Sequence, residues 1–147
     1  MCDRNTEIKE RNGYSVINCV LPLEVTDEDI DDIMVSALEG GICYWCTDAE
    51  IVAGGYSGTF ASEQISRGGA LRLRPFDMDE GEYLLTRGSF MEGFRKYIQA
   101  GHTECIVRKA DKFGVYTGKL GIDPGKIDAP AADCIIQYAV FGDIIYG

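Results

Sequence analysis

The stretch Ala37-Leu38-Glu39-Gly40-Gly41-Ile42-Cys43-Tyr44-Trp45-Cys46 decides the fold, because a helical pattern stops there at a pair of glycines. Glycine reaches the left-handed backbone conformation that commonly ends a helix at lower cost than any other residue. The segment that follows holds the only tryptophan of the chain and is therefore expected at a fixed angle to the helix. Large aromatic side chains at such a turn form either a corner of the core or a stacking site for a ligand.

The residues before this corner carry the clearest helix signal in the chain. Thr26 with Asp29 is close to a capping box, which favours a helix start. Apolar residues then recur with the spacing of one helical face, at Ile30, Ile33, Met34, Ala37 and Leu38. We therefore predict a helix from Thr26 to the glycine pair.

Further segments show the β-branched or alternating pattern that is typical of strands. They are residues 14–21, 42–52, 70–76 and 83–85. The last two are expected to form a hairpin, since a turn-rich segment lies between them. The region 102–127 is irregular and mildly basic, and the choice between an ordered hairpin and a loop stays open.

Two more helices are expected, one opened by the capping box Ser89-Phe90-Met91-Glu92 and ended by Gly101, the other running from Asp128 to Gly142. A single helical turn capped by Ser62 is expected within residues 61–69. This order of elements predicts an α+β fold. Its small antiparallel or mixed sheet, of roughly three to five strands, would be covered by about three helices.

Length and composition indicate one soluble domain. The chain has 147 residues, 46% of them hydrophobic, so we expect a single globular domain over residues 13–147 and an N-terminus that frays up to residue 12. No apolar run approaches the roughly 20 residues that span a membrane, and no signal-peptide core is seen. We therefore expect a cytoplasmic protein without membrane contact, and six reduced cysteines, with Cys19 and Cys134 in the core.

Negative charge is concentrated in the first part of the chain. The net charge is −10; residues 1–50 hold 12 acidic and 3 basic side chains, and residues 51–147 hold 12 and 11. Direct binding of nucleic acid is disfavoured, whereas binding to a basic protein surface, as a nucleic-acid mimic bound to a nuclease would do, is allowed. The partner-binding candidates are Glu24, Asp27, Glu28, Asp29, Asp31 and Asp32. The simpler interpretation is that these acids stabilise a helix start and keep the chain soluble.

A second glycine-rich cluster follows the tryptophan. Backbone N–H groups near glycine, hydroxyls and an arginine suit an anion or a nucleotide phosphate, and an aromatic ring could stack on a base. The candidate ligand-binding residues are Tyr44, Trp45, Ser57, Ser62, Gln64, Arg67, Gly68 and Gly69. The alternative is that these glycines only form turns and that the aromatic rings belong to the core.

Catalytic and metal-binding signals are weak. One histidine leaves little room for nucleophilic catalysis, and neither a phosphate-binding loop nor a dinucleotide fingerprint is present, so we expect a protein without enzymatic activity or cofactor. Cys43 and Cys46, with His102 and Cys105, offer zinc-ligand types, but their spacing matches no standard finger. A zinc-dependent module or enzyme stays the third alternative.

Three segments together carry a family resemblance. They are Glu39-Gly40-Gly41-Ile42-Cys43-Tyr44-Trp45, Ala61-Ser62-Glu63-Gln64-Ile65-Ser66-Arg67-Gly68-Gly69 and Ala132-Asp133-Cys134-Ile135-Ile136-Gln137-Tyr138-Ala139-Val140-Phe141-Gly142. From about residue 16 the chain resembles uncharacterised small acidic proteins of bacteriophages, prophages and mobile elements of Gram-positive bacteria. The resemblance implies an accessory protein of the bacterial host cytoplasm. Such a protein would bind and block a host protein or sequester a small nucleotide-like defence signal; its oligomeric state, including a homo-oligomer, stays open.

Overall fold

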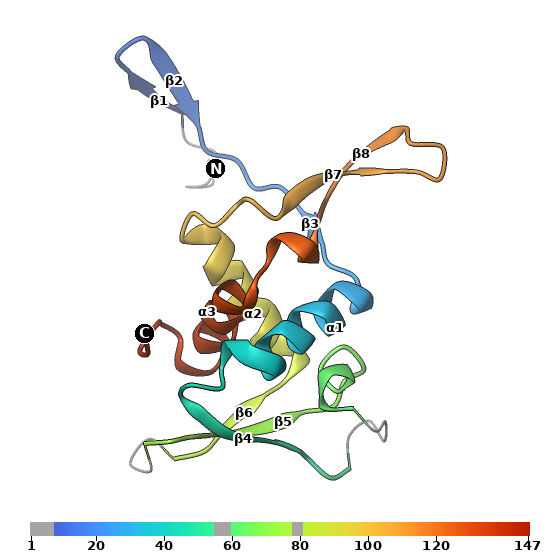
Figure 1. Cartoon of the computed structure of the whole chain (residues 1–147). Helices are drawn as coiled ribbons and strands as arrows, with labels where there is room; N and C mark the ends of the chain where they lie inside the picture. Colours follow the sequence, from blue (N-terminus) through green and yellow to red (C-terminus); the bar gives the residue numbers. More distant parts are fainter. Residues whose placement is uncertain (1–7, 55–59, 78–80) are drawn as a thin grey trace.

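The computed structural model describes residues 8–54, 60–77 and 81–147, and these residues form an α+β fold (Figure 1). Its three α-helices are α1 (Asp27–Ser36), α2 (Arg87–Gln99) and α3 (Ala129–Phe141). The predicted fold class and the three helices are confirmed. The strands divide between two three-stranded sheets, one antiparallel and one mixed, and a separate hairpin.

The antiparallel sheet contains β4 (Cys46–Ile51), β5 (Leu71–Pro75) and β6 (Tyr83–Leu85) in that order. The predicted hairpin between the last two strands is confirmed by the pairing of Leu71 with Leu85. On its inner face the side chains of Leu71, Leu73 and Leu85 are fully buried, and the helices lie on that side (Figure 1). Strand β4 begins later than predicted, because the backbone N–H of Cys46 bonds to Ile42 at 2.9 Å and closes a turn.

The mixed sheet contains β3 (Leu23–Glu24), β8 (Tyr116–Ile122) and β7 (Ile106–Ala110), with β3 parallel and β7 antiparallel to β8. The region 102–127 therefore contains an ordered hairpin. It continues into a 3₁₀ turn at Pro124–Lys126, which leads to the last helix.

The N-terminal strands β1 (Ile8–Arg11) and β2 (Tyr14–Ile17) form a hairpin that extends away from the helices (Figure 1). Part of the segment expected to fray is thus paired. The predicted strand over residues 14–21 ends at Ile17. The expectation that Cys19 lies in the core is wrong, since this segment leaves the body of the protein and Cys19 is exposed.

Capping residues set the helix boundaries. The predicted box at Thr26 and Asp29 is confirmed, because the N–H of Asp29 donates to Thr26 Oγ1 at 3.0 Å and the reciprocal bond is 2.9 Å long. Helix α2 begins earlier than predicted, since Thr86 and Ser89 form its capping box. Helix α3 starts at its N-cap Asp128 and stops at a left-handed glycine, Gly142, as predicted.

The glycine pair after α1 does not form a left-handed helix end, and its second member, Gly41, permits close packing instead. Helix α1 continues into a π-helical turn, η2 (Ala37–Gly41), and neither Gly40 nor Gly41 has a positive φ. A Cβ atom on Gly41 would lie 2.6 Å from the carbonyl oxygen of Ala129, at the start of α3. Glycine is required here because a helix of distant sequence approaches the backbone.

Candidate functional site

The corner after α1 is a corner of the core. The side chain of Trp45 is 2% exposed, and its ring stacks on Tyr146 with centroids 5.3 Å apart and contacts Phe141 at 5.2 Å. A ligand cannot stack on an indole that is covered in this way. The prediction that Trp45 forms part of a ligand-stacking surface is therefore wrong, and the alternative, a core corner, is confirmed.

A buried carboxylate fixes this corner. Asp133 of α3 accepts hydrogen bonds from Trp45 Nε1 at 2.6 Å, from the Tyr44 hydroxyl at 2.7 Å and from Gln137 Nε2 at 3.0 Å. The side-chain oxygen of Gln137 accepts two backbone N–H bonds from the C-terminal segment, including that of Tyr146 at 2.9 Å. Burial, and then the hydrogen bond to Asp133, raise the pKa of Tyr44 to about 12.

This network joins the corner, α3 and the C-terminal segment, so its role is structural. Tyr146 of the C-terminal segment is half-buried against the core, while Ile144 and Ile145 are exposed. The sequence analysis did not single out Asp133 or Gln137. The signal was available, because both polar residues lie four positions apart on the apolar face of a predicted helix.

The predicted ligand cluster does not assemble. Cys46 pairs with Pro75 and Ile51 pairs with Leu71, so Trp45 and Gly69 lie at opposite ends of the β4–β5 ladder. Strand residues advance about 3.3 Å each, which puts the two roughly 20 Å apart. Tyr44 lies beside Trp45 and binds Asp133, far from the remaining candidates.

Those remaining candidates belong to a packed segment. Its short 3₁₀ helix η3 (Ala61–Glu63) starts at Phe60, so the expected cap at Ser62 is wrong. Gln64 is fully buried and Ser66 donates to a carboxylate of α1. Arg67 and Gly68 are exposed and Gly69 is buried, whereas Ser57 lies outside the described residues.

The acidic start of α1 is largely engaged within the chain. Glu24 lies 3.2 Å from Lys109 Nζ and 3.6 Å from Lys119 Nζ, and the hydrogen bond from Lys109 lowers the pKa of Glu24. Asp27 pairs with Arg87 at 2.7 Å. Asp29 caps the helix and Asp31 accepts from Ser66, so only Glu28 and Asp32 of the six acids lack an ion pair or side-chain hydrogen bond among the described residues.

The cysteine and histidine candidates make other contacts. Cys43 Sγ donates to the carbonyl of Leu38 at 3.4 Å, and His102 stacks on Tyr97 with centroids 4.5 Å apart. Burial raises the pKa of the Cys46 and Cys105 thiols, which opposes the thiolate that a metal requires. Among the described residues no three His, Cys, Asp or Glu side chains gather to hold a metal ion.

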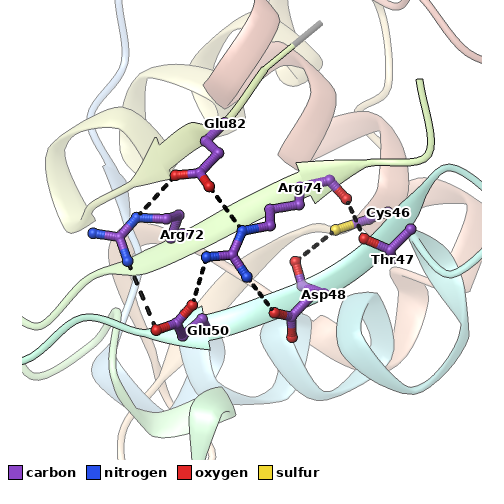
Figure 2. A network of polar contacts seen from close by, with 7 residues as sticks. All are labelled: Cys46, Thr47, Asp48, Glu50, Arg72, Arg74 and Glu82. Atoms are coloured by element: carbon purple, nitrogen blue, oxygen red, sulfur yellow. Dashed lines mark hydrogen bonds and ion pairs between the residues drawn. The ribbon is translucent and has the colours of Figure 1, made fainter. Parts of the chain in front are cut away.

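The outer face of the β4–β5–β6 sheet carries a charged network (Figure 2). Arg74 donates to Asp48 at 2.9 Å and to Glu50 and Glu82 at 2.8 Å each, while Arg72 lies 3.3 Å from Glu82. The hydrogen bond from Arg74 lowers the pKa of Glu82. Each of these five charged groups lies within ion-pair distance of a group of opposite sign, and the five together carry one net negative charge.

The β7–β8 hairpin is different, because it projects beyond the helices (Figure 1). It also exposes apolar and basic side chains together. Phe113 is 79% exposed, Val115 61% and Tyr116 57%. Residues 106–119 hold four cations and one acid, namely Arg108, Lys109, Lys112, Lys119 and Asp111. In a chain of net charge −10 this is a local reversal of sign.

Backbone bonds fix the tip of this hairpin. The carboxylate of Asp111 accepts the N–H groups of Phe113 at 2.9 Å and Val115 at 3.0 Å, and the turn passes through Gly114 at φ +79°. Asp111, the single acidic residue of the hairpin, therefore stabilises the turn through these two hydrogen bonds. The aromatic side chains are held outward by a defined loop rather than by contacts with the body.

Two cations of the hairpin lie over aromatic rings. The guanidinium carbon of Arg108 is 3.7 Å from the ring centroid of Tyr116, and Lys112 Nζ is 5.1 Å from that of Phe113. A hollow of about 240 Å³ is lined by Arg108, Tyr116, Gly118, Lys119 and Leu120. A second hollow of about 190 Å³ shares the last three of these residues and adds Leu21, Pro22 and Glu24.

We call the residues that line the two hollows the Gly118 groove: Leu21, Pro22, Glu24, Arg108, Tyr116, Gly118, Lys119 and Leu120. Each hollow is smaller than the roughly 300–1,000 Å³ of typical small-molecule pockets.

Comparison with protein families, curated proteins and solved structures finds no match to this chain. None of the helices in the described part of the chain is long and apolar enough to cross a membrane.

Proposed function

We propose that the protein is a non-enzymatic accessory protein of the bacteriophage or mobile-element type, which binds and blocks a protein of its bacterial host. The binding surface is the β7–β8 hairpin. The observation that carries this proposal is the cluster of exposed aromatic and basic side chains at residues 108–116, on a loop that is hydrogen-bonded through Asp111 and lies away from the body. Aromatic residues and arginine are the side chains most enriched at the centres of protein interfaces.

The other hypotheses have less support. At the predicted site, a nucleotide-like signal would need an accessible ring beside the glycine-rich segment, but Trp45 is buried and Tyr44, which is 54% exposed, lies beside Trp45, about 20 Å from that segment. A nucleic-acid mimic needs a row of open carboxylates, but a basic partner would have to displace the cations that already bind Glu24 and Asp27. Within the hairpin, by contrast, Arg108 and Lys112 have no ion pair among the described residues, and the side chain of Phe113 is exposed.

Site-specific photo-crosslinking in a Gram-positive bacterium tests this function. A photoreactive residue replaces Phe113 at the hairpin tip or Leu84 on the outer face of β6, an apolar control position that is 54% exposed. We expect a discrete crosslinked host protein from position 113 and none from position 84. The same partner should be lost when Tyr116 is changed to Ser. Crosslinks that are equal from both positions, or absent from both, would contradict the proposal.

A further inference from the structure

We propose that the Gly118 groove binds a short acidic segment of a partner protein, in which carboxylates alternate with aliphatic side chains. This inference rests on the proposed function and names the chemistry of the partner. The groove combines the apolar walls Leu21, Pro22 and Leu120 with the cation Arg108. Its second cation, Lys119, lies 3.6 Å from Glu24 at one end of the groove, so Arg108 is the cation that a carboxylate of the partner would bind. An extended segment presents successive side chains on opposite sides, so it can place a carboxylate at Arg108 and an aliphatic group on the walls.

The side chain of Arg108 is positioned to bind a carboxylate of the partner segment. Its guanidinium carbon lies over Tyr116, 3.7 Å from the ring centroid, and the guanidinium makes no ion pair with any described residue. A stacked guanidinium keeps the N–H groups of its edge available, and these match the two oxygens of a carboxylate. Stacking also removes side-chain freedom before the partner binds, which lowers the entropic cost of the contact.

The missing side chain of Gly118 creates the hollow beside this arginine. Gly118 has φ +82°, and a Cβ atom built there would meet no heavy atom within 4 Å. Its position between Tyr116 and Leu120 on the same strand leaves open space that a side chain of the partner can fill. Glycine is required here by the backbone conformation, and the hollow is the consequence.

An acidic protein segment suits this surface better than a nucleic acid. Lys109 and Lys119 already share the carboxylate of Glu24, so a continuous row of phosphates would run into Glu24 and the acidic start of α1. The net charge of −10 adds long-range repulsion against a polyanion. A segment with alternating charge needs only a few cations, and Arg108 and Lys112 lack any ion pair among the described residues.

The test is an NMR titration of the full-length chain with synthetic probes. The probes are a peptide of about ten residues that alternates Glu and Leu, the same peptide with Gln in place of Glu, and a single-stranded oligothymidine of about ten nucleotides. We expect the acidic peptide to shift the signals of the groove with a dissociation constant on the order of 0.1–1 mM. The neutral peptide and the oligonucleotide should bind about tenfold more weakly.

Matched variants locate the binding. Gly118→Asn fills the hollow with a residue that tolerates the left-handed backbone, and Gly13→Asn makes the same change at φ +79° in the β1–β2 turn, outside the β7–β8 hairpin. Arg108→Gln removes the stacked cation, and Arg95→Gln removes a cation on α2 as a control. We expect about tenfold weaker binding for the two groove variants and unchanged binding for both controls.

Several results would overturn this inference. They are no saturable binding of the acidic peptide, equal binding of the neutral peptide, equal or tighter binding of the oligonucleotide, and retained affinity in Gly118→Asn or Arg108→Gln. If the peptide fails while position 113 still crosslinks to a host protein, only the partner chemistry is wrong. If both experiments fail, the proposed function is wrong as well.

Discussion

The two three-stranded sheets of this protein use arginine in opposite ways. On the outer face of β4–β5–β6, Arg74 binds three carboxylates from two neighbouring strands (Figure 2). On the β7–β8 hairpin, Arg108 lies over Tyr116 and has no carboxylate among the described residues. The inner face of the first sheet is buried under helices, whereas the hairpin of the second extends beyond them (Figure 1).

This difference separates charges that maintain the fold from charges that are available to a partner. Cross-strand ion pairs on an exposed face contribute little stability each, but they leave no charge without a counterpart. A cation over an exposed ring contributes a similarly small amount, about 0.5–1 kcal/mol. We therefore expect substitutions in the body to change stability and substitutions in the hairpin to change binding.

The largest expected contrast concerns two phenylalanines. Phe90 of α2 is fully buried, so Phe90→Ala should lower the free energy of unfolding by about 3–5 kcal/mol. Phe113 at the hairpin tip is 79% exposed, and Phe113→Ala should change the free energy of unfolding by less than about 0.5 kcal/mol. Urea denaturation measures both values. If Phe90→Ala does not fold, Phe90→Leu, which removes less of the side chain, takes its place in the comparison. A large loss at position 113 would show that the hairpin packs on the body.

Local signals made much of the fold predictable. Thr26 and Asp29 start α1 through contacts three residues apart, and Asp128 and Gly142 bound α3 in the same local way. The alternation of Leu71 and Leu73 with basic residues revealed a strand with one buried face. These features depend on neighbours in the sequence, so composition and spacing suffice to read them.

The candidate site could not be read in the same way. The bond from Trp45 to Asp133 joins residues 88 positions apart, and no local pattern indicates it. The pairs that engage Glu24 also come from distant strands, so the acidic helix start looked more available than it is. The composition of the hairpin was visible as a mildly basic segment. Its projection from the body depends on how β8 pairs with β3 and β7.

Alanine substitutions at two glycines of α2 should differ by an intermediate amount in their effect on the free energy of unfolding. A Cβ atom at Gly93 would lie 2.5 Å from the backbone nitrogen of Ala139 in α3, whereas one at Gly88 would meet only a hydroxyl at 3.9 Å. Gly93→Ala should therefore lower the free energy of unfolding by about 1–3 kcal/mol, despite the better helix propensity of alanine. Gly88→Ala should be neutral or stabilise by up to about 1 kcal/mol.

Thermal or urea unfolding of the two variants measures this difference. If Gly93→Ala were as stable as Gly88→Ala, α2 and α3 would not cross as closely as the structure has them. The expected result would place the tightest packing between these two helices, in the body. By contrast, Gly114→Asn in the hairpin meets no atom within 4 Å and tests only backbone strain.

The smallest effect is a decrease of stability in alkaline solution that comes from the body. Burial raises the pKa of the Cys46 and Cys105 thiols above the ordinary value of 9.0, so the unfolded chain loses these protons first as the pH rises. The unfolded state then binds fewer protons than the folded state, so the free energy of unfolding falls as the pH rises above about 9. Below that pH both thiols are protonated in both states, and the free energy of unfolding does not change with pH on their account. Tyr97, whose pKa burial raises to about 12, extends the decrease above about pH 10.

Urea midpoints between about pH 8 and 10 measure this slope. The double variant Cys46→Ser and Cys105→Ser should flatten the slope relative to the exposed control Cys43→Ser, and an equal slope in both would assign the decrease to other groups.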